Sequence, residues 1–196
     1  MSLKTILNSI ISKFKGSAEQ EVTKAVTNAV ATKTYPVKLS PLPKSVDDLK
    51  QYDLTKPENT VALTIAALCM YPTDKEVCYA MLDYLMGPED LSQHDRYFIR
   101  DRFMNDVDYI PRSYFKGATP ENDYQGEEGN IEVLELAHTR DIEKDGYLTF
   151  WVRSGGADNP REIRVRTKPS TGEWFVNMFA GLLLGVKTPK SRNKWA

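Results

Sequence analysis

Hydrophobic residues follow a helical spacing in the middle of the chain. Three segments carry apolar residues three and four positions apart, which predicts three main helices. The first runs from Pro57 to residue 71 and is so nearly all apolar that it should be buried. The second is expected to be capped by Thr73, with Glu76 three positions on, and to end at Gly87. The third starts near Ser92, and a short helical turn is expected at 45–48.

Beyond residue 130 the pattern changes to short β-type runs separated by turn sequences. The runs are 131–137, 147–152, 162–166 and 173–176. In the third run Ile163 and Val165 alternate with arginines, which is typical of a half-buried antiparallel strand. The sequence therefore predicts an α+β fold in which a layer of three main helices packs on a C-terminal four-stranded antiparallel meander.

The N-terminal residues form an amphipathic pattern of their own. Lys4, Lys13 and Lys15 lie at the edges of an apolar stripe, and Gly16 is a plausible end for the helix. The opposite side is polar and holds Thr5, Ser9 and Ser12. The stripe could dock on this protein's own core or on a second copy, which we favour, or lie in a membrane interface. It consists of Leu3, Ile6, Leu7, Ile10, Ile11 and Phe14.

A proline-containing connector should separate this helix from the compact domain. Residues 18–33 repeat a weaker helical pattern, and residues 35–45 hold three prolines and no glycine. We therefore assign 1–44 to an amphipathic helix and connector that need not be fixed to the rest, and 45–196 to a single α+β domain.

The formal net charge of −1 hides an uneven distribution. Residues 1–56 carry +4, residues 57–145 carry −11 and residues 146–196 carry +6. We expect the basic C-terminal part to pack beside the acidic middle part; the alternative is a basic face kept for an anionic partner. Nothing in the balance indicates nucleic acid.

Cysteine usage and hydropathy point to the cytoplasm. Cys69 and Cys78 fall in apolar helical patterns at a spacing that suits no zinc or redox site, and we expect free thiols in a reducing compartment. No apolar run is long enough to span a membrane. Polar residues such as Asn8 and Ser9 interrupt the apolar core that a signal peptide would need.

Motifs of catalysis are not recognisable. The chain has two histidines, His94 and His138, and neither lies in a zinc, P-loop, Rossmann, nucleophile-elbow or EF-hand pattern. We therefore assign no catalytic residue, metal ligand or cofactor, and regard an enzyme as the less favoured class.

Two loops are richer in turn and polar residues than their neighbours. In 111–122, Gly117 and Pro120 would fix a bend. In 153–161, Gly155 and Gly156 could form an anion-binding concavity, but a strand follows where such a site normally leads into a helix. We favour a hairpin in which the glycines supply positive φ. The candidate ligand-binding residues of the two loops are Arg112, Gly117, Thr119, Asn122, Ser154, Gly155, Gly156, Asp158 and Arg161.

These motifs resemble an uncharacterised bacterial family of the domain-of-unknown-function class, found in Firmicutes and their relatives. The similarity lies in a Gly-Ala-Thr-Pro-x-Asn loop at 117–122 and a Ser-Gly-Gly-Ala-Asp-x-Pro-Arg segment at 154–161. It continues in a Gly-x-Trp strand at 172–174 and a Trp-Ala end at 195–196, so it covers about residues 45–196. The run at 126–136 departs from the family pattern, because a proline-containing run into the first strand is expected there and this sequence has no proline. The resemblance implies a bacterial intracellular protein and brings no activity or ligand.

We therefore predict a non-enzymatic binding module of a bacterial cytoplasm, whose partner is another protein or a second copy. One alternative is an enzyme or regulator acting on a small anionic molecule, which would need Arg112, Arg161 or Arg164 to converge with a carboxylate. Another is peripheral attachment to a membrane surface through residues 1–15, which we do not favour.

Overall fold

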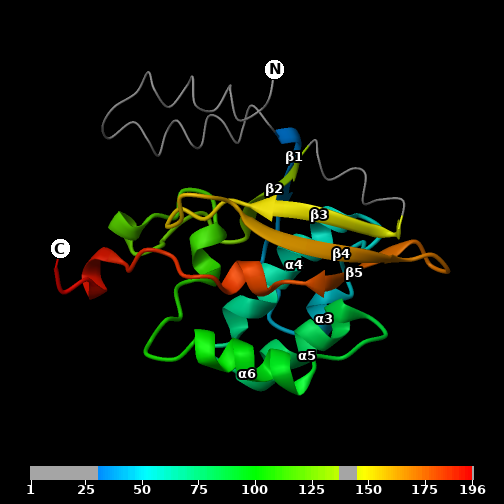
Figure 1. Cartoon of the computed structure of the whole chain (residues 1–196), viewed down its shortest axis with the longest axis horizontal. Helices are drawn as coiled ribbons and strands as arrows, with labels where there is room; N and C mark the ends of the chain where they lie inside the picture. Colours follow the sequence, from blue (N-terminus) through cyan, green and yellow to red (C-terminus); the bar gives the residue numbers. More distant parts are fainter. Residues whose placement is uncertain (1–30, 137–144, 196) are drawn as a thin grey trace.

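An antiparallel sheet of five strands, in the order β1-β2-β3-β4-β5, forms one layer of the molecule (Figure 1). The computed structural model describes residues 31–136 and 145–195. The strands are β1 (Ala31–Lys38), β2 (Asn130–Leu136), β3 (Tyr147–Val152), β4 (Arg161–Lys168) and β5 (Glu173–Met178). Helices α3 (Val46–Leu49), α4 (Pro57–Met70), α5 (Lys75–Met86) and α6 (Gln93–Arg102) lie on one face of the sheet.

The expected architecture of three main helices on four strands is wrong, although the class is α+β. Within the described residues there are four α-helices and five strands. The additional helix is the short α3, and the additional strand is β1. The four C-terminal runs are strands with bounds close to those expected.

Strand β1 was missed because its proline suggested a connector. It is an edge strand that pairs with β2 from Ala31↔Leu136 to Lys38↔Asn130. Pro36 is tolerated there because an edge strand does not need every N–H for its ladder. Tyr35 and Val37 alternate with exposed neighbours and pack toward the core. The short period-2 pattern was hidden by the helical pattern that precedes it.

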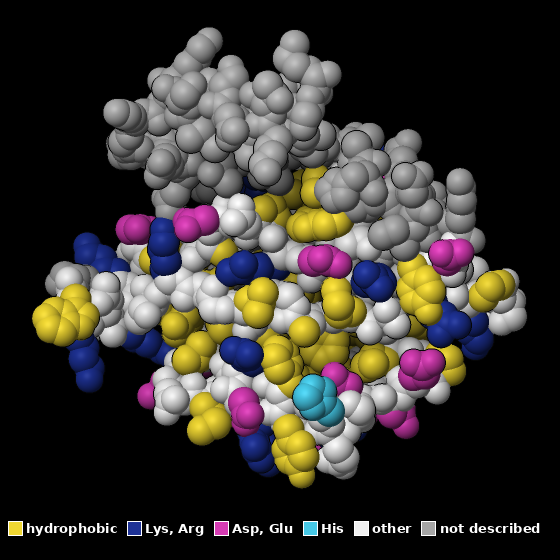
Figure 2. Space-filling view, viewed as in Figure 1, with side chains coloured by type: hydrophobic (Ala, Val, Ile, Leu, Met, Phe, Trp, Pro, Cys, Tyr) yellow, Lys and Arg dark blue, Asp and Glu magenta, His cyan; other side chains and the backbone are white. Residues whose placement is uncertain are grey.

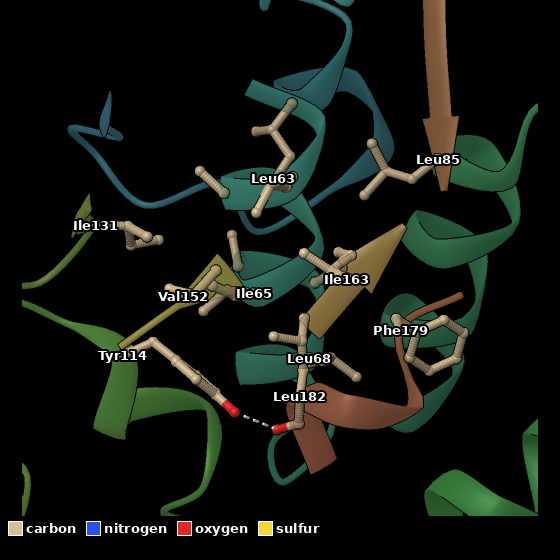
Figure 3. Packing of buried hydrophobic residues seen from close by; sticks show 14 of the residues in the cluster. Leu63, Ile65, Leu68, Leu85, Tyr114, Ile131, Val152, Ile163, Phe179 and Leu182 are labelled. Atoms are coloured by element: carbon tan, nitrogen blue, oxygen red, sulfur yellow. Dashed lines mark hydrogen bonds between the residues drawn. The ribbon is translucent and has the colours of Figure 1, made fainter. Parts of the chain in front are cut away.

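The core is built around α4, which contacts all five strands. Figure 3 shows Leu63, Ile65 and Leu68 of this helix beside side chains of β2, β3 and β4, among them Val152 and Ile163. All these side chains are fully buried. A helix that is apolar on every side has to be covered on every side, and α5 packs against α4 in addition to the sheet.

Local signals at the helix ends are mostly as expected. Ser92 and Asp95 form a reciprocal capping box at the start of α6, and Gly87 follows the last turn of α5 with φ +74°. The cap of α5 is Asp74 rather than Thr73, and its side chain accepts hydrogen bonds from the N–H groups of Glu76 and Val77. Aspartate caps a helix as well as threonine does, so the two neighbours compete for the position.

After β5 the chain returns across the end of the sheet. Two 3₁₀ turns, η4 (Ala180–Leu183) and η5 (Lys190–Arg192), lie in this C-terminal segment, which runs beside the loops of residues 105–128 (Figure 1). The Tyr114 hydroxyl donates a hydrogen bond of 2.8 Å to the Leu182 carbonyl, drawn in Figure 3. The segment thus closes the core beside α4.

Shortening a buried side chain of α4 should show how far the stability of the fold depends on this helix. We expect Leu63→Ala to lower the free energy of unfolding by about 2–5 kcal/mol, because it leaves a cavity in a site with no access to water. Leu184→Ala is the matched control, since Leu184 is 43% exposed and its loss should cost less than about 1 kcal/mol. Urea denaturation followed by circular dichroism measures both; equal losses would contradict the central place of α4.

Candidate functional site

The two loops singled out in the sequence lie against each other. Gly155 donates its backbone N–H to the Ser113 carbonyl at 2.8 Å. The Ser154 hydroxyl donates to the Ser113 hydroxyl, also at 2.8 Å, and both serines are buried. The turn η1 (Pro111–Tyr114) is therefore fixed to the hairpin between β3 and β4.

Close backbone approach explains the paired glycines of that hairpin. A Cβ on Gly155 would lie 1.7 Å from the Ala118 carbonyl oxygen, and one on Gly156 would lie 1.9 Å from the Tyr124 hydroxyl oxygen. Neither glycine has a positive φ, so the expectation that they supply one is wrong. The hairpin itself is confirmed, and its glycines are needed for packing.

The same contacts leave no anion-binding concavity at the glycines. The Gly155 N–H is used by Ser113, and the Gly156 N–H donates to the Ser154 hydroxyl at 3.2 Å. The Gly156 carbonyl accepts the N–H of Lys187 at 2.8 Å. Donors that are already paired inside the protein are not available to a ligand, so this interpretation of the motif is set aside.

The 117–122 loop is held by its own side chains. Asn122 accepts the Thr119 N–H at 2.8 Å and donates to the Gly117 carbonyl at 2.9 Å. Thr119 and Asn122 cap the turn η2 (Pro120–Asn122) reciprocally. Gly117 has φ +77°, as the predicted bend requires. Two of the candidate ligand-binding residues, Thr119 and Asn122, therefore shape the loop.

A hollow of about 300 Å³ lies between this loop and the hairpin, and we call it the loop–hairpin hollow. Among the described residues β2 and β3 pair at Val133↔Val152 and Leu134↔Trp151, and Glu132 and Arg153 of the hollow lie just beyond these pairs. Four of the candidate residues line it, together with others that the sequence did not indicate. The lining is Tyr114, Phe115, Lys116, Gly117, Ala118, Thr119, Glu132, Arg153, Ser154 and Gly155.

Three charged side chains give the loop–hairpin hollow its chemistry. The Lys116 ammonium lies 3.8 Å from a Glu132 carboxylate oxygen. Burial lowers the pKa of the Arg153 guanidinium, and the Glu132 carboxylate opposes that effect. The charged members of the lining are therefore two cations and one carboxylate, and the Arg153 guanidinium is partly desolvated.

The remaining candidates lie elsewhere. The Arg161 guanidinium donates to the Gly185 carbonyl at 2.7 Å, and Asp158 lies 3.5 Å from the Lys187 ammonium. The Arg112 guanidinium lies 3.6 Å from an Asp108 carboxylate oxygen, and Arg112 lines a different hollow. Arg164 follows Ile163 of the core and so points to the opposite face of the sheet. Arg112 thus approaches a carboxylate, whereas Arg161 and Arg164 lie elsewhere, so the three guanidinium groups do not meet at one carboxylate.

A second charged cluster was not anticipated. Arg192 of η5 bonds the Asp108 carboxylate and the Asp106 carbonyl, and Arg112 approaches the same carboxylate. Hollows of about 470 and 670 Å³ flank Arg192. The only hint in the sequence was the opposite charge of the two segments, because these residues lie more than eighty positions apart.

The Asp108 carboxylate is stabilised in its charged form. Burial alone would raise its pKa, but the hydrogen bond and charge of Arg192 and the charge of Arg112 outweigh burial and lower it. On the other side of Arg192, the Asp123 carboxylate accepts the Ser191 N–H at 2.9 Å. The cluster attaches the C-terminal segment to the loops on both sides.

Ion pairs join the acidic and basic parts of the chain. Besides Arg192 with Asp108, the Arg166 guanidinium lies 3.7 Å from Glu89. Figure 2 shows Lys and Arg side chains interspersed with Asp and Glu on the face that it draws, without a large patch of one sign. This agrees with mutual neutralisation of the two parts.

Some sequence expectations fall outside these contacts. The N-terminal stripe and His138 lie outside the described residues. In residues 31–136 and 145–195, no group of three or more His, Cys, Asp or Glu is placed to hold a metal ion. No helix in these ranges is long and apolar enough to cross a membrane.

Residues 41–190 match the model of a family described as a domain of unknown function (DUF6935). No curated protein and no solved structure matches the chain. The match confirms the expected class of family. It begins after β1, although that strand completes the sheet by pairing with β2 inside the matched region.

Adding a methyl group at Gly155 should separate the two loops. We expect Gly155→Ala to lower the free energy of unfolding by about 1–3 kcal/mol, because the Ala118 backbone must move away. Gly185→Ala is the control, since a Cβ there meets no atom within 4 Å and should be nearly neutral. Thermal unfolding of both variants checks this, and a stable Gly155→Ala would refute the close-approach argument.

Acid should weaken the protein partly through Asp108. Its folded-state pKa is lowered, so its stabilising effect is complete above the unfolded pKa of about 3.9 and is lost as the pH falls through the lower folded value. Asp108→Asn should cost about 1 kcal/mol at pH 7 and much less below about pH 3. Asp101→Asn, on the exposed pair with Arg100, is the control and should cost less than about 0.5 kcal/mol. Urea titrations from pH 7 to 2.5 distinguish the two.

Proposed function

The chain belongs to the DUF6935 family of domains of unknown function, and we propose that it acts as a non-enzymatic binding module. Its partner would be another protein, and the binding surface would be the loop–hairpin hollow. A carboxylate of the partner would enter between Lys116 and Arg153. The protein would work in the reducing cytoplasm of a bacterium.

The observation that carries the proposal is the joining of two sequence-distant loops around one charged hollow. Lys116 comes from the 111–122 loop and Arg153 from the start of the hairpin. The Ser113–Gly155 and Ser113–Ser154 bonds join the two backbone segments from which these side chains extend. Preorganised charges bind with less loss of conformational entropy.

The charges favour an acidic group. The charged side chains that line the hollow are two cations, Lys116 and Arg153, and one carboxylate, Glu132. Arginine is suited to bidentate contact with a carboxylate, and lysine adds a point charge. Tyr114 and Phe115 also belong to the lining, although both are largely buried in the core.

The hydroxyl groups at the site argue for binding rather than covalent chemistry. A nucleophilic serine needs a base within hydrogen-bonding reach. The Ser154 hydroxyl instead donates to Ser113 and accepts from the Gly156 N–H, and it is buried. The residues that line the loop–hairpin hollow include no histidine or cysteine.

The proposed cytoplasmic location is based on the two cysteine thiols. Cys69 and Cys78 are free, and burial raises the pKa of the Cys78 thiol well above its usual value. A protonated, buried thiol behaves as a small apolar side chain and is compatible with a reducing compartment.

An acidic peptide tests the surface directly. We expect a ten-residue polyglutamate peptide to shift the amide resonances of residues 114–119 and 153–155 in a ¹⁵N-labelled sample of the full chain. Arg153→Ala and Lys116→Ala should each weaken binding about tenfold, which corresponds to about 1.4 kcal/mol. The affinity should fall with added salt, since the contact is between charges.

Matched controls are available on the helical layer. Lys75→Ala and Arg100→Ala remove exposed charges outside the hollow and should leave the affinity unchanged. Polyglutamine of the same length should not bind. If polyglutamate shifts none of these amides, or if Arg153→Ala and Lys116→Ala bind it as the parent does, the proposal fails. Binding of citrate or inorganic phosphate but not of the peptide would indicate a small anionic ligand instead.

A further inference from the structure

The sheet face that points away from α4, here called the outer face, carries apolar side chains on its middle strands. Val133 and Val152 are paired neighbours in the core. The next pair along the ladder, Leu134 and Trp151, therefore points to the outer face, because side chains alternate along a strand. A solvated face of an antiparallel sheet is normally polar, so this composition needs an explanation.

The centre of the outer face is shielded from water. Leu134 is 0% exposed although it lies outside the buried cluster that contains the α4 side chains, and Thr149 is 3% exposed. Thr34, the neighbour of Leu134 on the edge strand, is exposed. The shielding therefore lies over β2 and β3 rather than over the edge strand.

Two buried polar atoms mark the same area. Thr149 on β3 pairs with Arg164 on β4, one step from the core pair of Phe150 and Ile163. The Thr149 hydroxyl oxygen and the Arg164 Nε are both buried, and neither has a hydrogen-bond partner among the described residues. Water would hydrate these atoms if the face were open, so their state agrees with a covering segment.

The chain offers a segment of suitable size and position. Residues 1–30 lead directly into β1, whose first residue, Ala31, pairs with Leu136 at the end of β2. A helix of residues 1–15 would be about 22 Å long. A strand of six or seven residues spans about 20–23 Å, so the two lengths match.

We propose that the apolar stripe of residues 1–15 docks on the outer face of its own chain, over Leu134 and Trp151. The stripe supplies six apolar side chains to a face that holds apolar residues outside the core. Lys13 and Lys15 at its margins would lie toward Glu132 and Glu162, the acidic side chains that alternation places on the same face. The binding surface proposed above is not required for this inference.

A thiol placed at position 149 reports whether the cover is present. In the full-length chain carrying Thr149→Cys, we expect slow reaction of that thiol with a maleimide dye. Adding Ile6→Glu and Ile10→Glu should displace the stripe and raise the rate at least tenfold. The charge-matched control is Thr5→Glu with Ser9→Glu, on the polar side of the same segment, which should leave the rate unchanged. Circular dichroism confirms that each variant is folded.

Other occupants of the outer face give different results. If the variant carrying Ile6→Glu and Ile10→Glu reacts no faster than its parent, residues 1–15 are not the cover and the proposal is overturned. A rate that falls as protein concentration rises would assign the cover to a second copy and would also overturn it. The proposal is also overturned if the full chain floats with anionic phospholipid vesicles and the thiol at position 149 reacts faster when they are present.

Cross-linking tests the proposal without displacing anything. Treatment of the unmodified chain with a carbodiimide should join Lys13 or Lys15 to Glu132 or Glu162 within a monomer, as read by mass spectrometry after gel filtration. Cross-links of these residues found only in dimers, or their absence while other Lys–Glu pairs react, would contradict intramolecular docking.

Discussion

The burial of α4 is the constraint on which the rest of the structure depends. A helix with apolar residues on every side cannot leave any side in water, so several elements have to surround it. The sheet covers one side, α5 another, and η1 with the C-terminal segment closes the end. Its two buried threonines do not disturb this, because Thr60 donates to the Trp174 carbonyl and Thr64 to the Thr60 carbonyl.

Closing the end of the core brings the 111–122 loop and the β3–β4 hairpin together. Tyr114 has to reach the Leu182 carbonyl, and this places η1 beside the β3–β4 hairpin. The hairpin can approach because Gly155 has no side chain where it meets the Ala118 carbonyl. The loop–hairpin hollow is therefore a by-product of packing, which fixes the backbone segments that carry its two cations.

The helices and the β3–β4 hairpin could be predicted because their signals depend on interactions between residues close in sequence. Pro57 in the first turn, the Ser92 cap, Gly87 after α5 and the alternation of Ile163 and Val165 in β4 each depend on neighbours a few residues away. Strand β1 was missed for the opposite reason. Whether residues near Pro36 form a connector or an edge strand depends on β2, which lies about a hundred positions further along the chain.

The sequence by itself determined the class of the fold, the four C-terminal strands and the two loops that deserved notice, because period, turn residues and caps act at short range. Only the tertiary structure decided what the loops do. Gly155 and Gly156 do not have the expected positive φ, and they are needed because other atoms approach them closely. Their N–H groups bond within the protein. The side chains of Arg112, Arg161 and Arg164 lie apart from one another. The tertiary structure also brought Arg153 to the hollow that Lys116 lines, since which charges meet depends on how distant segments pack.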